Sequence, residues 1–243
     1  IKTIDRTYTM TNTANFHPSL ELLTDFSQGK LATGISVALS AHLELCEICQ
    51  EKASKLESEA AKFWAKAADD KTSPDFSDMI SAIVGQAQTT YDESAGKQER
   101  PPVNEIHMLH HSVTLPRVLA KAASQGLVWK TLAGGIKRAS VIVDNKTQCE
   151  FIYMPPGSQV PVHRHQGSEV TLVLDGSFSD ELGHYRATDF MVRTKDNLHK
   201  PTSEEGCLCF AVLDSPLTFT KGFAKLMNPL IEYKFRKALA ARA

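Results

Sequence analysis

A chain of 243 residues can form one large domain or two of ordinary size, so its length leaves the number of domains open. Its 42% hydrophobic and 23% charged residues are typical of a globular protein, and the net charge of -1 provides no basic field that would attract nucleic acid. Direct DNA binding is therefore not expected.

The sequence also argues against export and membrane insertion. No apolar stretch approaches the roughly 20 residues that cross a bilayer, and the first residues lack the pattern of a secretion signal. The five cysteines are an odd number, unlike the dense paired framework of small secreted folds, which favours reduced thiols or metal thiolates. We therefore expect a cytoplasmic protein, and because residues 1–9 have little pattern, we begin its first domain at residue 10.

Residues 18–64 are expected to be largely helical. Pro18 suits the first helical position, because its missing N–H would be unpaired there anyway, and apolar residues then follow at helical spacing until Gly29. A second helix is expected over about residues 35–45. A third carries an apolar stripe on one side, formed by Leu56, Ala60, Phe63, Trp64 and Ala67.

A fourth helix is predicted to start at Ser73-Pro74, where Asp75 and Asp78 favour the positive end of the helix dipole. The apolar residues of this helix fall on one face: Phe76, Met79, Ile80, Ile83 and Val84. That face either packs within the helical domain or docks a partner.

The hydrophobic period changes after a polar stretch that ends at Pro101-Pro102, which is linker composition. Short runs rich in Val, Ile, Leu and Phe follow at residues 127–132, 136–143, 150–154, 170–174 and 208–212. Many short strands separated by turn residues predict an all-β barrel or sandwich. We therefore expect a helical domain (10–85), a linker (86–104), a β-domain (105–227) and a C-terminal tail (228–243) that forms a terminal helix.

The helical domain contains a candidate zinc site. His42 and Cys46 are four residues apart in a predicted helix and so share one face, and Cys49 follows after the two-residue gap common in zinc-binding cysteine pairs. His17 can supply the fourth ligand, which would close a tetrahedral site and leave no position for catalysis. The alternative is that both cysteines are small buried residues and that His42 lies on the surface.

These residues resemble the zinc-binding anti-sigma domain of the ChrR family, in which a histidine near the start joins a His-x-x-x-Cys-x-x-Cys segment. The resemblance extends from His17 to about Val84. It implies that the domain inhibits an extracytoplasmic-function-type sigma factor by inserting between the sigma regions that otherwise hold promoter DNA and core polymerase.

The second half contains the complete first motif of the cupin family, running from Gly157 to Gly176. Within it, His163 and His165 alternate along a predicted strand and so point to the same side, and Glu169 follows them. The second motif is less regular, with Ala187 where many cupins have glycine, and His199 is its expected ligand. The β-domain is therefore predicted to be a cupin (jelly-roll) barrel with a four-ligand metal site; the alternative is that these histidines lie on the surface.

Three imidazoles and a carboxylate accept several divalent metals. Zinc is the first expectation for the cupin site, and iron, manganese or nickel are alternatives. Cys207 and Cys209 alternate within a predicted strand and are either redox-responsive thiols or small core residues. Cys149 carries no signal, and no role is assigned to His107, His110, His111 or His184.

ChrR-type regulators combine this helical domain and this barrel in this order. The resemblance implies an anti-sigma factor whose cupin domain promotes release of the sigma factor under oxidative stress, with singlet oxygen or organic peroxides as the stimulus. One alternative is a metal-dependent cupin oxidoreductase or dioxygenase with a helical appendage, which turnover would reveal. Another is a protein that stores or senses metal and exchanges it at both sites.

Overall fold

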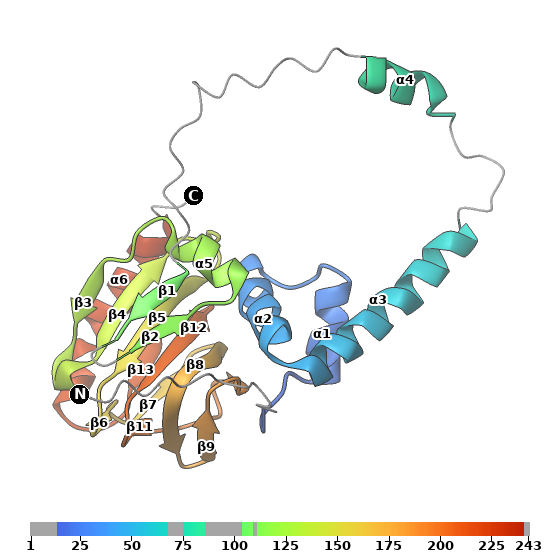
Figure 1. The fold of residues 1–243 in the computed structure, drawn as a ribbon. Coiled ribbons are helices and arrows are strands. Elements are labelled where there is room, and N and C mark those ends of the chain that lie inside the picture. The colour runs from blue at the N-terminus through green and yellow to red at the C-terminus, as the bar shows by residue number, and fades with distance from the viewer. Residues whose placement is uncertain (1–13, 68–74, 86–103, 109–110, 241–243) are drawn as a thin grey trace.

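The computed structural model describes residues 14–67, 75–85, 104–108 and 111–240, and helices precede a curled antiparallel sheet along the chain (Figure 1). The predicted fold class, a helical domain followed by a cupin barrel, is confirmed. The expected start at residue 10, the Ser73-Pro74 helix start, the 86–103 part of the linker and His110 lie outside the described residues. The domain boundaries at 85 and 104 stay a prediction.

The helical part consists of α1 (Leu20–Ser27), α2 (Thr33–Leu45), α3 (Glu47–Ala67) and α4 (Ser77–Gly85). The prediction that Pro18 occupies the first helical position was wrong. Helix α1 begins at Leu20 because Ser19 is the N-cap, and its hydroxyl accepts a hydrogen bond from the Leu22 N–H at 3.1 Å. The helix ends before Gly29, whose φ of 66° suits the left-handed turn that follows.

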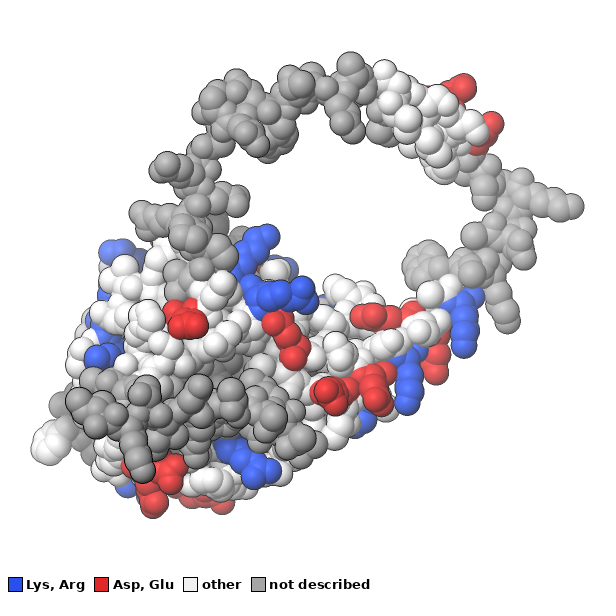
Figure 2. Space-filling model, in the orientation of Figure 1, with Lys and Arg blue, Asp and Glu red and all other residues white. Residues whose placement is uncertain are grey.

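The charged surface differs between these helices. Acidic and basic side chains lie side by side along α3, whereas α4 is almost free of charge apart from acidic residues at its start (Figures 1 and 2). On α4, the side chains of Phe76, Met79, Ile80 and Val84 are exposed. The side chains of Phe63, Trp64, Ala67 and Ile83, which belong to the predicted apolar faces, lie outside the described residues.

The barrel is built around the twelve-residue strand β8 (Glu169–Asp180). Gly176, with φ of 69°, divides it: the first part pairs with β10 (Phe190–Arg193) and the second with β9 (Gly183–Arg186). The main sheet continues from β8 through β12 (Cys207–Leu213), β5 (Gln148–Met154) and β4 (Lys137–Val141) to β3 (Trp129–Thr131).

Shorter elements complete the fold. The remaining strands are β1 (Glu105–His107), β2 (Ser112–Thr114), β6 (Ser158–Gln159), β7 (His163–His165), β11 (Thr202–Ser203) and β13 (Leu217–Phe219). The remaining helices are α5 (Arg117–Ala123), η2 (Ala133–Gly135), η3 (Phe223–Met227) and α6 (Asn228–Ala240). Helix α6 confirms the predicted terminal helix, and Phe235 anchors it in a small core with Ala211 and Leu213 of β12.

The helices and the barrel share one continuous hydrophobic core. Leu23 of α1 and Leu39 of α2 belong to the same buried cluster as Val170 of β8, Phe190 of β10 and Phe210 of β12. Helix α2 thus packs directly on the sheet (Figure 1). The two fold classes that the sequence separates are therefore joined in space, and α2 connects them.

Gly34 allows α2 to approach the barrel closely. A Cβ at this position would overlap Thr147 Oγ1 and lie 2.8 Å from Cys149 Sγ, and the Gly34 N–H donates to Asp144 Oδ2 at 2.7 Å. We expect Gly34→Ala to lower the free energy of unfolding by about 1–3 kcal/mol, because the helix must shift from a packed interface. Chemical denaturation measures this change.

Gly85→Ala is the matched control for Gly34→Ala. A Cβ at Gly85 would meet nothing within 4 Å, so its effect should stay below about 1 kcal/mol. Equal stability of Gly34→Ala and the parent chain would contradict the role of Gly34.

Candidate metal centres

The first candidate centre lies where α1, α2 and α3 meet. One donor atom each of His17, His42, Cys46 and Cys49 lies within 4.8 Å of the others. His17 Nδ1 is 3.5 Å from Cys46 Sγ and 3.3 Å from Cys49 Sγ. His42 and both cysteines are buried, whereas His17 is half-buried.

The backbone places these donors differently from the simple helical expectation. His42 lies in the last turn of α2, but Cys46 is an extended residue (φ -129°, ψ 101°) between α2 and α3, and Cys49 lies in the first turn of α3. The prediction that His42 and Cys46 share the face of one helix was therefore wrong. The break at Cys46 turns the chain, so that His42 and Cys49 approach each other from two helices.

His42 has the protonation state that a metal ligand needs. Its Nδ1 is 3.0 Å from the Thr188 carbonyl oxygen, so Nδ1–H donates and the lone pair lies on Nε2. Burial lowers the pKa of His42 to about 4, which keeps the imidazole neutral near pH 7. Within the described residues, Nε2 is buried without a hydrogen-bond partner, and a metal ion would satisfy it.

The surroundings of Cys49 oppose ionisation of its thiol. Burial and the neighbouring Cys46 raise the pKa of Cys49 to about 12. A metal ion between the sulfurs would reverse this penalty, because it deprotonates a coordinating thiol. Two imidazoles and two thiols are a donor set that zinc accepts, so the cluster fits a zinc site.

The second candidate centre lies inside the barrel. His163 and His165 come from β7, Glu169 begins β8, and His199 pairs with His163 in an isolated bridge. One donor atom from each lies within 4.8 Å of the others. His165 Nε2 is 2.8 Å from Glu169 Oε2 and 3.2 Å from His199 Nε2, so three of the four donors converge closely.

Hydrogen bonds on the far side of two imidazoles direct their Nε2 atoms to this centre. His163 Nδ1 lies 2.9 Å from the Pro161 carbonyl oxygen, and His199 Nδ1 lies 3.2 Å from Asp180 Oδ2. Such outer contacts fix the tautomer of metal-binding histidines. Burial, together with the nearby His199, lowers the pKa of His163 to about 4, which keeps it neutral.

Glu169 supplies the negative charge of the second centre. Burial opposes ionisation, but His165 and the other two histidines lower the pKa of Glu169 to about 2, and 12% of its side chain is exposed. Three imidazoles and one carboxylate therefore fit a divalent cation. This donor set does not by itself distinguish zinc from other transition metals.

Comparisons with known proteins agree with this arrangement. Residues 120–215, which contain the whole second centre, match the ChrR cupin-like domain family. The anti-sigma-E factor ChrR of Cereibacter sphaeroides is 28% identical over 222 residues, which are 89% of this chain and 98% of that protein. The chain is thus similar to ChrR along most of its length. The sequence-based resemblance is thereby confirmed.

Solved structures extend the comparison. The crystal structure of Rhodobacter sphaeroides SigE in complex with the anti-sigma ChrR aligns with 83% of this chain and 100% of that chain, at 26% identity and a TM-score of 0.64. An RmlC-like cupin from Ralstonia eutropha aligns with 47% of this chain and 84% of its own, at 16% identity and a TM-score of 0.37.

A buried thiol pair lies in the barrel core. Cys207 and Cys209 are buried with their Sγ atoms 3.9 Å apart, and the β12–β8 register shifts between Leu208 and Cys209. The hydrogen bond from Cys209 lowers the pKa of Cys207 below that of an ordinary thiol, although burial opposes this. The hydrogen bond to Cys207 and burial raise the pKa of Cys209, and the charge of Glu169 adds to this effect.

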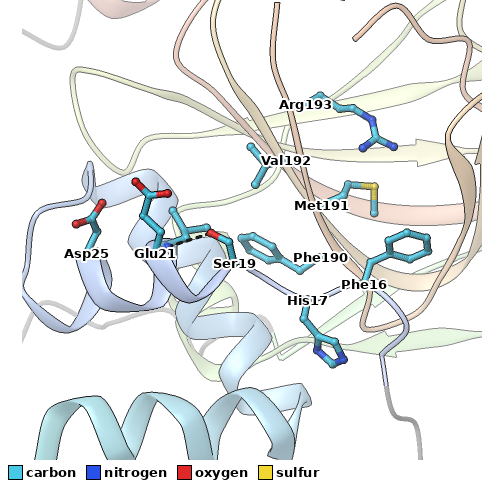
Figure 3. Close-up of a pocket in the computed structure, with 10 residues that line it drawn as sticks. Phe16, His17, Ser19, Glu21, Asp25, Phe190, Met191, Val192 and Arg193 are labelled. Atoms are coloured by element: carbon cyan, nitrogen blue, oxygen red, sulfur yellow. Dashed lines mark hydrogen bonds between the residues drawn. The ribbon is translucent and has the colours of Figure 1, made fainter. Parts of the chain in front are cut away.

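The other unassigned residues lie outside both centres. Cys149 is buried beside Thr147, and His107, His111 and His184 contact Ser112, Asp175 and Ser179. A groove between α1 and β10, shown in Figure 3, lies next to the first centre and includes His17.

Sequence reasoning missed two buried carboxylates of this chain. Asp180 contacts the ligand His199, and Asp189 accepts hydrogen bonds from the backbone N–H groups of Asn15 and Phe16. The spacing of the sequence marks neither residue. Both contacts depend on how distant segments meet.

Proposed function

We propose that this chain binds and inhibits an extracytoplasmic-function-type sigma factor through its helical domain. The observation that carries the proposal is the similarity to the anti-sigma-E factor ChrR over 89% of this chain, with both ligand clusters assembled. The structural similarity to ChrR in complex with SigE supports the same partner class. The cytoplasm, where sigma factors act, is the expected location, and no described helix is long and apolar enough to span a membrane.

We assign a structural zinc ion to His17, His42, Cys46 and Cys49. With four protein donors the ion would have no position for substrate. It would hold the segment before α1 and the facing ends of α2 and α3 in one arrangement. Zinc therefore serves inhibition by fixing the helices that present the sigma-binding surface.

We add the exposed face of α4 to the sigma-binding surface as a second contact region, separate from the helices that zinc would hold. Ile80 and Val84 are 55% and 77% exposed, and Phe76 and Met79 extend the same apolar face. A contiguous exposed apolar face is typical of a protein–protein interface. The absence of basic residues from α4 also suits contact with a protein better than contact with nucleic acid (Figure 2).

The double variant Met79→Asp/Ile80→Asp is expected to weaken sigma binding by at least about 30-fold. It places two charges where apolar side chains would be buried in the complex. Losses of about 1–3 kcal/mol per contact are common when such interface residues are replaced. Calorimetry with the purified sigma factor measures the affinity. Asp78→Lys changes the charge by the same amount on the side of the helix away from Ile80 and should leave the affinity within about twofold. Equal binding by both variants would remove α4 from the interface.

The barrel is assigned to signal reception. We propose that His163, His165, Glu169 and His199 hold a divalent metal, with zinc favoured over iron, manganese or nickel, and that oxidative stress acting here promotes release of the sigma factor. The buried thiol pair Cys207 and Cys209 beside Glu169 supports a redox-responsive barrel. Singlet oxygen or an organic peroxide is the proposed stimulus.

A reconstituted system tests the proposed function. The full chain, mixed with an extracytoplasmic-function-type sigma factor from the same organism, should form a stable complex and stop transcription from a promoter that this sigma factor recognises. Treatment with an organic peroxide should release the sigma factor. A chain that forms no complex with that sigma factor would refute the proposal. The relatives that span most of the chain are regulators and not enzymes, which argues against the cupin oxidoreductase alternative.

A further inference from the structure

Asp180 is a buried acceptor at the end of β8 that binds a ligand of the second centre. Its Oδ2 lies 3.2 Å from His199 Nδ1 and 3.0 Å from the Arg193 guanidinium, and none of its side chain is exposed. Its Oδ1 accepts hydrogen bonds from the N–H groups of Leu182 and Gly183 at 2.8 and 3.1 Å. The orientation of the His199 imidazole is thus tied to a carboxylate that the backbone holds in place.

The contacts around Asp180 suit a carboxylate, because its two oxygens accept from the Leu182 and Gly183 N–H groups and from the Arg193 guanidinium. A carboxylate of this kind favours the His199 tautomer with hydrogen on Nδ1 and a lone pair on Nε2. Asp180 is therefore a positioning residue for a metal ligand.

Tyr185 connects the same carboxylate to the N-terminal segment. Its hydroxyl donates to Asp180 Oδ1 at 3.0 Å and also contacts the Arg193 guanidinium, and the residue is only 1% exposed. Its ring packs on Phe16, with ring centroids 4.7 Å apart. One buried side chain thus touches the outer shell of the second centre and the residue that precedes the ligand His17.

The segment that carries His17 is fixed to the barrel next to this contact. The N–H groups of Asn15 and Phe16 donate to Asp189 Oδ1 at 2.6 and 3.1 Å, and the Phe16 carbonyl accepts from the Phe190 N–H at 2.9 Å. Figure 3 shows Phe16 and His17 leaving this segment on different sides, with Phe16 toward Met191 of β10 and His17 away from that strand.

The second histidine of the first centre is attached to the same turn of the barrel. His42 Nδ1 donates to the carbonyl of Thr188, which has a φ of 78°. A β-branched residue rarely adopts this left-handed conformation, and it persists only where surrounding contacts impose it. Here the Thr188 N–H donates to Val173 O at 2.8 Å. Both histidines of the first centre are therefore positioned by the turn between β9 and β10.

We infer that Asp180 and Tyr185 couple the two metal centres, so that metal bound in the barrel slows metal loss from His17, His42, Cys46 and Cys49. A metal ion that orients His199 also orients Asp180, which holds the Tyr185 hydroxyl, and the Tyr185 ring supports Phe16 beside His17. The inference rests on the proposed metal centres. Such a pathway is established only by a measured coupling, and any coupling of binding equilibria must be reciprocal.

The test uses the full chain loaded with Co²⁺ in place of zinc. Only the first centre contains thiol ligands, so the thiolate-to-cobalt absorption band reports that centre alone. Excess chelator is added, and the rate at which the band disappears is measured. Two proteins are compared: the parent chain and the double variant His163→Ala/Glu169→Ala. The variant lacks two barrel ligands but keeps His199 and Asp180. We expect the double variant to lose the band at least about fivefold faster, the lower end of typical couplings.

The coupling variants are Tyr185→Phe, which removes the hydroxyl and keeps the ring on Phe16, and Asp180→Asn. For each variant, band loss is measured with the barrel ligands intact and with His163→Ala/Glu169→Ala added. The ratio of these two rates should fall below about twofold. The reason is that Asp180→Asn weakens the contact to His199, and Tyr185→Phe removes the contact to Asp180. Tyr153→Phe is the matched control: Tyr153 lies on β5 in a pocket with Trp129 and Lys137, and its variant should keep the full ratio.

Two results would overturn the coupling: equal rates with and without the barrel ligands, or an unchanged ratio in Tyr185→Phe. Failure of the first centre to develop a thiolate band would overturn it as well. A chain that shows the coupled rates but binds no sigma factor would instead refute the proposed function and leave the coupling standing.

Discussion

Replacing Cys46 and Cys49 together by serine is expected to remove the metal of the first centre and to abolish binding of the sigma factor. Structural zinc contributes about 10–16 kcal/mol of apparent free energy in small zinc-binding peptides, which equals or exceeds the whole stability of a typical domain. Without it, two buried polar side chains face two imidazoles where α2 and α3 meet. We expect the affinity for the sigma factor to fall more than about 100-fold.

Elemental analysis and a binding titration measure this prediction. The double variant should contain one metal ion fewer per chain than the parent protein. Cys149→Ala is the matched control, because Cys149 is also a buried thiol but lies outside both clusters, and it should retain the metal and the sigma factor. A Cys46→Ser/Cys49→Ser chain that binds the sigma factor with unchanged affinity would exclude a structural role for zinc in inhibition.

The double variant His163→Ala/Glu169→Ala is expected to separate inhibition from sensing. Removing two of four donors, one of them the only carboxylate among the four, should eliminate metal binding in the barrel. The residues of the first centre and the α4 face are unchanged, so the chain should still bind the sigma factor. If the two centres are coupled, loss of the barrel metal should lower this affinity by no more than about tenfold. Release of the sigma factor by an organic peroxide should be lost.

Release is measured as free sigma factor after peroxide treatment of the purified complex. His184→Ala removes an exposed histidine, bonded to Ser179 and outside the cluster, and should release the sigma factor as the parent chain does. Undiminished release from His163→Ala/Glu169→Ala would show that the barrel metal has no part in the response. Loss of sigma binding from that variant would show that inhibition itself needs the barrel metal.

The shared core explains why these experiments use full-length variants. Leu39 of α2 packs in one buried cluster with Val170 and Phe210 of the barrel, and Gly34 brings the helix backbone against Thr147 and Cys149. A fragment ending near residue 85 would expose the barrel-facing side of α2 to water. Its failure to bind a sigma factor would therefore reflect lost packing as readily as lost recognition.

The fold class and the membership of both clusters could be predicted from the sequence, because the signals are local. His163 and His165 alternate along one strand, and the short spacings among His42, Cys46 and Cys49 limit how far apart their side chains can lie. The spacing was less informative about backbone detail. It missed the cap at Ser19 and the extended conformation of Cys46, which depend on contacts made by neighbouring turns.

The connection between the two clusters became visible only in three dimensions. The hydrogen bond between Asp189 and Asn15 joins residues 174 positions apart, and the bond between His42 and Thr188 joins residues 146 apart. Such contacts depend on how α2 docks on the sheet and on which residues the β9–β10 turn presents, and neither produces a periodic pattern in the chain. Local spacing therefore predicted the members of both clusters, whereas long-range packing decided which buried groups surround them.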